Sequence, residues 1–161
     1  KQKTAYEISL GLVGSEMCIR DRFWVAFKRG NQLEHLNSVQ PKDLASQNVL
    51  LLNKTHCLRS QISNLISQQD ESDLNTIASS LETLINLVAA GEGCTLVPAL
   101  ALQSAWTTDM GILVRKLDDQ SANRKIRLVF RKNFTRTKQV HELAKMIGYQ
   151  SPNTVKILMK N

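Results

Sequence analysis

Cys57 is the residue of this sequence best placed to do chemistry. It follows His56, and Arg59 lies two residues beyond it. An apolar run ends at Leu52 and apolar residues recur at helical spacing from Leu58 onward, so we expect a strand, a tight loop and a helix start. A helix N-terminus and a nearby cation both favour a thiolate, which attacks peroxides, disulfides and metals. The pattern predicts a reactive cysteine, although most lone cysteines are small buried hydrophobic residues.

A reactive cysteine needs elements that position it, and the rest of the sequence predicts an alternation of helices and strands. Short apolar runs indicate buried strands, and apolar residues at helical spacing indicate helices. The expected strands are residues 23–27, 48–52, 75–78, 93–98, 111–114 and 126–130, and the expected helices are 57–67, 79–91, 99–105 and 139–147. We therefore expect an α/β fold in which helices cover the faces of a sheet.

The clearest helix signal is the segment 79–91. Ser79 and Glu82 have the spacing of a capping box, and Gly91 provides a left-handed C-terminal stop. Apolar residues between them make one face of the helix. This helix is expected to pack on the strand that follows it.

Length and composition indicate about one globular domain. The chain has 161 residues, 42% of them hydrophobic, and its mean hydropathy is −0.22. No apolar run approaches the ~20 residues that a membrane helix needs. The three cysteines, Cys18, Cys57 and Cys94, contain no CxxC pair, so we expect neither a disulfide framework nor a metal site. This cysteine usage fits a reducing compartment, and we expect a cytoplasmic protein without a cofactor.

Positive charge is concentrated in the last third of the sequence. The net charge is +7, and twelve Lys or Arg residues follow from Arg115 onward against three acidic residues. A basic face can bind nucleic acid. No aromatic interleaving or known DNA-reading motif accompanies these charges, and a solvated surface is the commoner explanation.

Residues 1–22 differ in character from the rest. The run 6–22 looks like translated sequencing-adapter sequence, and the chain does not begin with methionine. We expect residues 1–22 to be a non-native segment in which Cys18 is not a site. Residues 23–149 are expected to form the domain, and residues 150–161 a C-terminal tail.

Two stretches carry a family resemblance. Residues 80–98 run from a helix into a strand that ends at a proline, and the strand 125–131 follows at the right distance. Together they resemble the effector domain of LysR-type transcriptional regulators. Over residues 23–149 the resemblance implies an incomplete periplasmic-binding-protein-like domain, with the second subdomain and the last part of the first. It also implies a homodimer or homotetramer that binds DNA only through a missing N-terminal domain, with no membrane contact.

Residues 56–59 resemble the peroxide-sensing loop of the hydrogen-peroxide-inducible activators in that family. The resemblance implies that Cys57 is the redox-sensing cysteine. It also implies that His56, Arg59 and Arg131 support the site. Thr55, or a hydroxyl from the missing subdomain, would hold the peroxide.

Three positions depart from the family pattern. Ser60 stands where the family has an aspartate, and Asn75 stands where it has a histidine. Ile66 occupies the position of the resolving cysteine, so the family's intramolecular disulfide cannot form as usual. A one-cysteine switch would signal through sulfenic acid, a mixed disulfide with a small thiol or an intermolecular bridge.

The main hypothesis is therefore a regulatory domain, not an enzyme, that senses hydrogen peroxide or small thiols through Cys57. One alternative keeps the family but makes Cys57 incidental, with a small anionic metabolite as the ligand. A thiol peroxidase would need rapid recycling, for which no resolving thiol is visible. A periplasmic solute receptor is disfavoured because no signal peptide is found.

Overall fold

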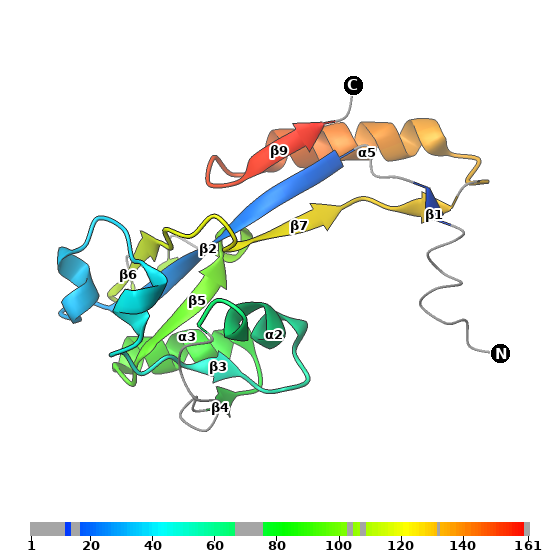
Figure 1. Ribbon diagram of the computed structural model, residues 1–161. Helices are drawn as coiled ribbons and strands as arrows, with labels where there is room; N and C mark the ends of the chain where they lie inside the picture. The colour runs from blue at the N-terminus through cyan, green and yellow to red at the C-terminus, as the bar shows by residue number, and fades with distance from the viewer. Residues whose placement is uncertain are drawn as a thin grey trace. The chain divides into compact units, whose positions relative to one another are not determined.

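The computed structural model describes residues 12–13, 17–66, 76–102, 105–106, 109–131 and 133–159. The chain divides into two compact units, which are described separately below (Figure 1). Unit 1 contains residues 1–21 and 124–161, and unit 2 contains residues 22–123. No helix in the described part of the chain is long and apolar enough to cross a membrane.

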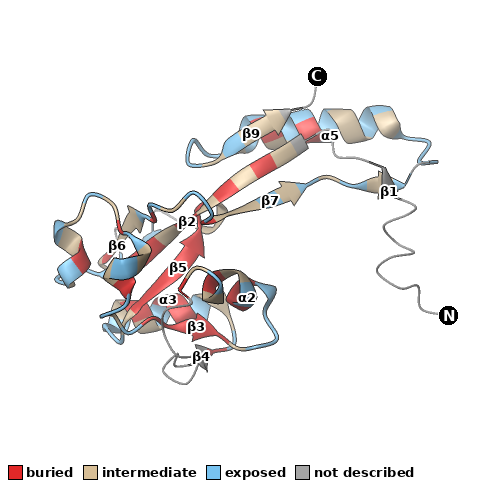
Figure 2. Cartoon of the chain, in the orientation of Figure 1, coloured by how far each residue is buried: buried red, intermediate tan, exposed pale blue. Residues whose placement is uncertain are grey.

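Unit 2 contains most of the helices and strands. Its elements are β2 (Met17–Lys28, from Arg22 onward), η1 (Gln32–His35), η2 (Pro41–Leu44), β3 (Leu51–Leu52), α2 (Cys57–Ser63), β4 (Thr76–Ala78), α3 (Leu81–Ala90), β5 (Cys94–Pro98), η3 (Ala99–Ala101) and β6 (Ile112–Lys116). Here β2 runs antiparallel between β5 and β6. Val25, Ala26 and Phe27 have no exposed surface. Because successive residues of a strand point to opposite faces, both faces of β2 are covered here. Figure 2 shows β2, β5 and β3 as the buried centre of this unit.

The helix α3 forms where the sequence predicts it and packs on β3, β4 and β5. Leu84, Ile85 and Val88 are its buried face, in agreement with the predicted apolar stripe. Gly91 ends the helix at a φ of 91°, a left-handed conformation that glycine adopts at little cost. The predicted cap is off by one residue, because the Ser80 side chain, not Ser79, accepts the hydrogen bond from the Thr83 amide.

The strand that precedes the cysteine loop is tied to β5. The Leu50 amide donates to the Cys94 carbonyl at 2.8 Å, and the Cys94 amide donates to the Asn48 carbonyl at 3.0 Å. The buried Thr95 hydroxyl adds a bond to the Leu50 carbonyl at 2.8 Å. Beyond these contacts β3 pairs in parallel with β4. The chain therefore enters the cysteine loop from a segment that is hydrogen-bonded to β5 and paired with β4.

Unit 1 is smaller and more polar. Its elements are β1 (Leu12–Val13), the first residues of β2, β7 (Asn123–Arg127), β8 (Phe130–Arg131), α5 (Thr137–Gln150) and β9 (Lys156–Met159). Both β9 and β7 pair with β2, and β1 pairs with β8. The fully buried Asp21 accepts a 2.8 Å hydrogen bond from Arg124 Nε, which compensates its charge.

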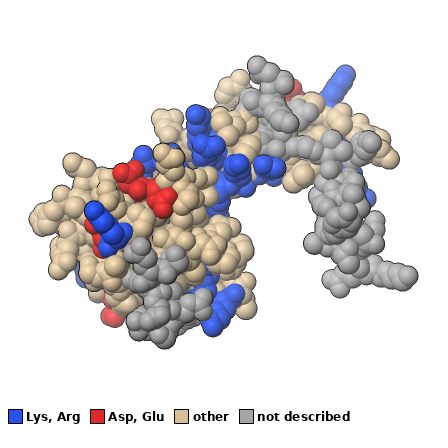
Figure 3. Space-filling model, viewed as in Figure 1, with Lys and Arg blue, Asp and Glu red and all other residues tan. Residues whose placement is uncertain are grey.

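The basic residues of unit 1 lie mainly on its surface. The exposed cations on its strands, its long helix and the loop before that helix are Lys125, Arg127, Arg131, Arg136, Lys138, Lys145 and Lys156. Figure 3 shows Lys and Arg side chains spread over the face in view. Lys145 forms an ion pair with Glu142 on α5. This exposure agrees with a solvated basic surface.

Several element boundaries differ from the sequence predictions. The strand expected at 23–27 begins at Met17, because Met17–Arg20 pairs with β9. The strand expected at 126–130 is two shorter strands, β7 and β8. The helix expected to end near Ile147 continues to Gln150, with Gly148 buried inside it. The helix expected over residues 99–105 is only the short turn η3 over the described residues at its start. The proposed division at residues 22 and 149 stays a prediction.

Candidate functional site

The cysteine loop is shaped by Asn53. Its side-chain oxygen accepts bonds from the Thr55 amide at 3.3 Å and from the Thr55 hydroxyl at 2.5 Å. Its carbonyl accepts a bond from the His56 amide at 3.1 Å. An asparagine side chain that bonds the backbone two residues on is a common turn former. The turn carries the chain from β3 into α2 within four residues.

Cys57 is the first residue of α2, and it is exposed. Its carbonyl accepts a hydrogen bond from the Ser60 hydroxyl at 2.9 Å. The other two cysteines have different surroundings. Cys94 is buried inside β5, where burial raises the pKa of its thiol to about 12. Cys18 lies in unit 1 and is partly exposed. Of the cysteines in unit 2, only Cys57 presents its thiol to solvent.

His56 is the N-cap residue of α2, but its side chain makes no capping hydrogen bond. Its Nε2 atom lies 2.6 Å from the Ser79 carbonyl oxygen. A carbonyl oxygen can only accept, so Nε2 carries the hydrogen and donates. The imidazole thus connects the cysteine loop to the residues that precede α3.

Arg59 is buried, with 7% of its surface exposed. Its Nη1 donates to the Leu52 carbonyl at 3.0 Å, at the end of β3. Its own carbonyl accepts a bond from the Ser63 hydroxyl at 3.0 Å. The guanidinium therefore joins α2 to β3, and it has little freedom to move.

Arg131, Ile66 and Asn75 are the other positions that the sequence analysis discussed. Arg131 is exposed in β8 and belongs to unit 1, whereas Cys57 belongs to unit 2. The role implied for Arg131 at the sensing site therefore stays a prediction. Ile66 is 4% exposed and is part of the apolar core, and Asn75 lies outside the described residues.

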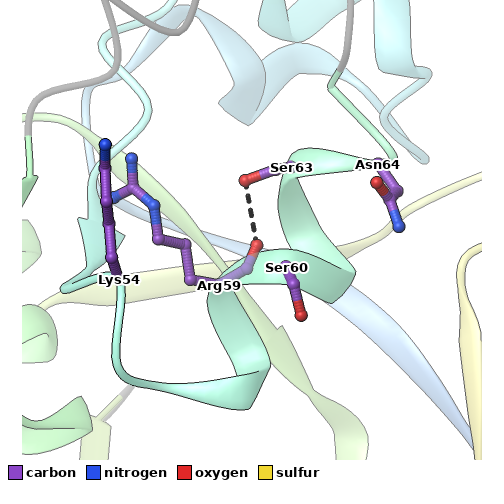
Figure 4. Close-up of a pocket in the computed structure, with 5 residues that line it drawn as sticks. All are labelled: Lys54, Arg59, Ser60, Ser63 and Asn64. Atoms are coloured by element: carbon purple, nitrogen blue, oxygen red, sulfur yellow. Dashed lines mark hydrogen bonds between the residues drawn. The ribbon is translucent and has the colours of Figure 1, made fainter.

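A pocket beside α2 was missed by the sequence analysis. Its volume is about 290 Å³, and it is lined by Lys54, Arg59, Ser60, Ser63 and Asn64 (Figure 4). Four of these residues are on α2 or its C-cap at helical spacing, and Lys54 comes from the loop before the helix. The helical spacing of these polar residues in the sequence could have indicated the pocket. The predicted helix ran to Ser67, but α2 ends at Ser63, so Asn64 lies at its end.

The polar residues of the described segments do not form a metal site. Among them, no group of three or more His, Cys, Asp or Glu side chains could hold a metal ion. The chemistry that the geometry offers is therefore that of an exposed thiol beside a cationic pocket.

The comparisons with known proteins extend over most of the chain. The LysR substrate binding domain family matches residues 9–151. The DNA-binding transcriptional dual regulator OxyR of Escherichia coli K12 is 37% identical over 106 residues, which are 65% of this chain and 34% of that protein. The chain thus spans about a third of the length of this curated relative.

Solved structures show the same fold. The reduced form of OxyR from N. meningitidis gives a TM-score of 0.75 at 26% identity, over 92% of this chain and 68% of that chain. A cysteine-to-serine mutant of OxyR from Corynebacterium glutamicum, bound to hydrogen peroxide, gives a TM-score of 0.67 at 26% identity, over 92% and 53% of the two chains. The predicted α/β, periplasmic-binding-protein-like fold is confirmed, and it is present in part. The predicted family is also confirmed: this chain belongs to the LysR substrate-binding domains.

Proposed function

We propose that this chain is the regulatory domain of a LysR-type transcriptional regulator that senses hydrogen peroxide through Cys57. The observation that carries the proposal is the exposed thiol of Cys57 at the first residue of α2. Relatives named as hydrogen peroxide-inducible genes activators, such as that of Escherichia coli O157:H7, support the choice of oxidant. An anionic metabolite as the main signal would leave this exposed cysteine without a role.

The proposed reaction is a simple two-electron oxidation. The Cys57 thiolate attacks one peroxide oxygen, a sulfur–oxygen bond forms and the oxygen–oxygen bond breaks. The leaving oxygen takes up a proton and departs as water. Sulfur is oxidised to sulfenic acid and the peroxide is reduced. Cys94 is a poor competitor, because a buried thiol with a raised pKa supplies little thiolate and offers no access.

The loop supplies positioning groups for this reaction. Thr55 is exposed two residues before Cys57, so its oxygen is the proposed contact for the peroxide. His56 holds the loop to the Ser79 carbonyl, and Arg59 holds α2 to the end of β3. These contacts fix where the thiol stands relative to the core of unit 2.

Oxidation at this position is proposed to act as a switch. The new oxygen is polar, and it is added at the start of a helix whose Leu58 and Ile62 are buried. We expect the loop to rearrange to accommodate this oxygen. The rearrangement would then change the contacts of His56 with Ser79 and of Arg59 with Leu52. A free-energy difference of ~1–3 kcal/mol between two arrangements is enough to shift their populations appreciably.

The same proposal includes the localisation, the oligomeric state and the partners of the regulator. We place the regulator in the cytoplasm, as a homodimer or homotetramer without enzymatic activity. DNA binding is assigned to an N-terminal domain outside this chain. Hydrogen peroxide and small thiols are its proposed reaction partners.

The test compares two cysteine variants in the full-length regulator. Cys57→Ser should abolish the change in target-promoter activity on peroxide addition, and Cys94→Ser should retain it. Thermal unfolding of both variants checks that each is folded. A normal peroxide response in Cys57→Ser would overturn the proposal.

Arg131 needs a test of its own, because it lies in unit 1. If it supports the site, Arg131→Gln should slow the oxidation of Cys57 severalfold. Arg127→Gln, on the neighbouring strand of unit 1, is the control for loss of one surface charge. Equal rates in the two variants would remove Arg131 from the site.

A further inference from the structure

The pocket beside α2 has an unusual lining for its size. Its five residues are two cations, two serines and an asparagine, and none of them is acidic. The volume of about 290 Å³ exceeds the ≈ 30 Å³ share of a water molecule roughly tenfold. The pocket is therefore large enough for a small organic group, and its charge favours an anionic one.

Positive charge in the pocket comes from Lys54 and Arg59. The Ser60 and Ser63 hydroxyls both donate to backbone carbonyls, of Cys57 and Arg59, so their hydrogens are already used. Figure 4 shows the Lys54 and Arg59 side chains extending to the same side of α2, while the Ser60 hydroxyl points the other way. A guanidinium carries its N–H donors in a planar fork whose geometry matches a carboxylate.

Lys54 is the solvent-facing member of this pair. It is exposed, and within the described segments it has no hydrogen bond or ion pair. It stands three residues before Cys57 in the same loop. Arg59 supplies a fixed cation and Lys54 an adaptable one, which together suit a carboxylate.

The position of the pocket matters because unit 2 offers no second thiol near its surface. Cys94 is buried, and Ile66 is an apolar core residue. A sulfenic acid on Cys57 must therefore react with a thiol from outside unit 2. Ser60 lines the pocket and donates to the Cys57 carbonyl, and it lies one helical turn after Cys57.

We infer that the pocket formed by Lys54, Arg59, Ser60, Ser63 and Asn64 binds the carboxylate of a small thiol that resolves oxidised Cys57. This inference rests on the proposed function. The thiol sulfur attacks the sulfenic sulfur, a disulfide bond forms and the sulfenic oxygen leaves as water with the thiol proton. A second molecule of the thiol then releases Cys57 as a thiolate and leaves as its own disulfide.

The test measures selectivity for anionic thiols in the full chain. Cys57 is oxidised with hydrogen peroxide, and the rate of mixed-disulfide formation is followed with mercaptoacetate, which is anionic, and mercaptoethanol, which is neutral. Mass spectrometry confirms that the disulfide is on Cys57. Since thiols differ in intrinsic reactivity, the measured quantity is the ratio of the two rates in each variant, not either rate alone.

Lys54→Gln should lower the ratio of anionic to neutral rates about three- to tenfold, which is the size of one lost charge-assisted contact. Lys42→Gln removes an exposed lysine from η2 in the same unit and should leave the ratio unchanged. Sulfate should compete with mercaptoacetate and not with mercaptoethanol. Equal ratios in wild type, Lys54→Gln and Lys42→Gln would overturn the inference.

A second arm does not depend on peroxide. Reduced Cys57 is reacted with dithiobis(nitrobenzoate), which carries two carboxylates, and with the neutral dithiodipyridine. Lys54→Gln should slow only the first reaction. If peroxide fails to oxidise Cys57, the proposed function fails whatever this arm shows. If oxidation succeeds but Lys54→Gln changes neither arm, only the assignment of the pocket fails.

Discussion

Cys57 and Cys94 belong to the same unit and have opposite surroundings. Cys57 follows an Asn53-directed turn and is exposed at the start of α2. Cys94 is fully buried in β5, with its amide and carbonyl both bonded to the segment before β3. The comparison shows that the fold decides which cysteine can react. One thiol is placed where an oxidant can reach it, and the other is used as a core residue.

The largest predicted effect concerns the proton on Cys94. Burial raises the pKa of this thiol from 9.0 to about 12, so between these pH values the unfolded chain loses a proton that the folded chain keeps. Stability from this group is fully present below about pH 9 and is lost as pH rises toward about 12. Each pKa unit corresponds to about 1.4 kcal/mol, so the free energy of unfolding should fall by roughly 4 kcal/mol across the window.

Urea unfolding of wild type and Cys94→Ala across that window checks this prediction. Alanine does not titrate, so the difference between the two pH profiles isolates the thiol. Parallel profiles would show that Cys94 is more accessible to water than its burial indicates.

A second prediction concerns Gly93, the residue before Cys94. A Cβ atom on Gly93 would collide with the Asn48 carbonyl oxygen, which accepts the Cys94 amide. Gly93→Ala should therefore lower the free energy of unfolding by roughly 3 kcal/mol and make Cys94 open to alkylation. The result is read from urea unfolding and from the rate of iodoacetamide labelling at Cys94.

Gly111→Ala is the matched control. Its φ of 65° strains a side chain, but the new Cβ meets nothing within 4 Å, so the cost should be about 1 kcal/mol and Cys94 should stay protected. Equal labelling of Cys94 in the two variants would mean that general destabilisation, not the contact with Asn48, exposes the thiol.

The smallest predicted effect separates two neighbouring serines. Ser80 caps α3, so Ser80→Ala should cost about 1 kcal/mol of stability. Ser79→Ala should change stability little, because His56 contacts the Ser79 backbone carbonyl, which the substitution keeps. Both variants should leave the labelling of Cys57 fast. A larger loss in Ser79→Ala than in Ser80→Ala would restore the cap that the sequence predicted.

Local patterns predicted local structure well. The apolar stripe and Gly91 predicted α3 and its end, and the run before Asn53 predicted a strand leading to Cys57. The cap was misplaced by one residue, since two adjacent serines have equal capping ability and the Glu82 spacing favoured the wrong one. The end of α5 was misjudged because Gly148 is buried within the helix, where packing outweighs its low helix propensity.

Features that depend on distant partners could not be read from the sequence. The first residues of β2 are a strand because they pair with β9, more than a hundred residues later. Arg59 is buried and bonds the Leu52 carbonyl, a contact that depends on how α2 packs against β3. The pocket at Lys54 is a different case, because its lining residues all lie between positions 54 and 64, and the helical spacing of its polar residues could have indicated it.

The central claim is that peroxide oxidises Cys57 and spares Cys94. The most direct test treats the chain with one equivalent of hydrogen peroxide, traps sulfenic acid and maps the modified cysteine by mass spectrometry. Rapid label on Cys57, with Cys94 labelled only after unfolding, is the predicted result. Slow label on Cys57, or equal label on Cys57 and Cys94, would contradict the account.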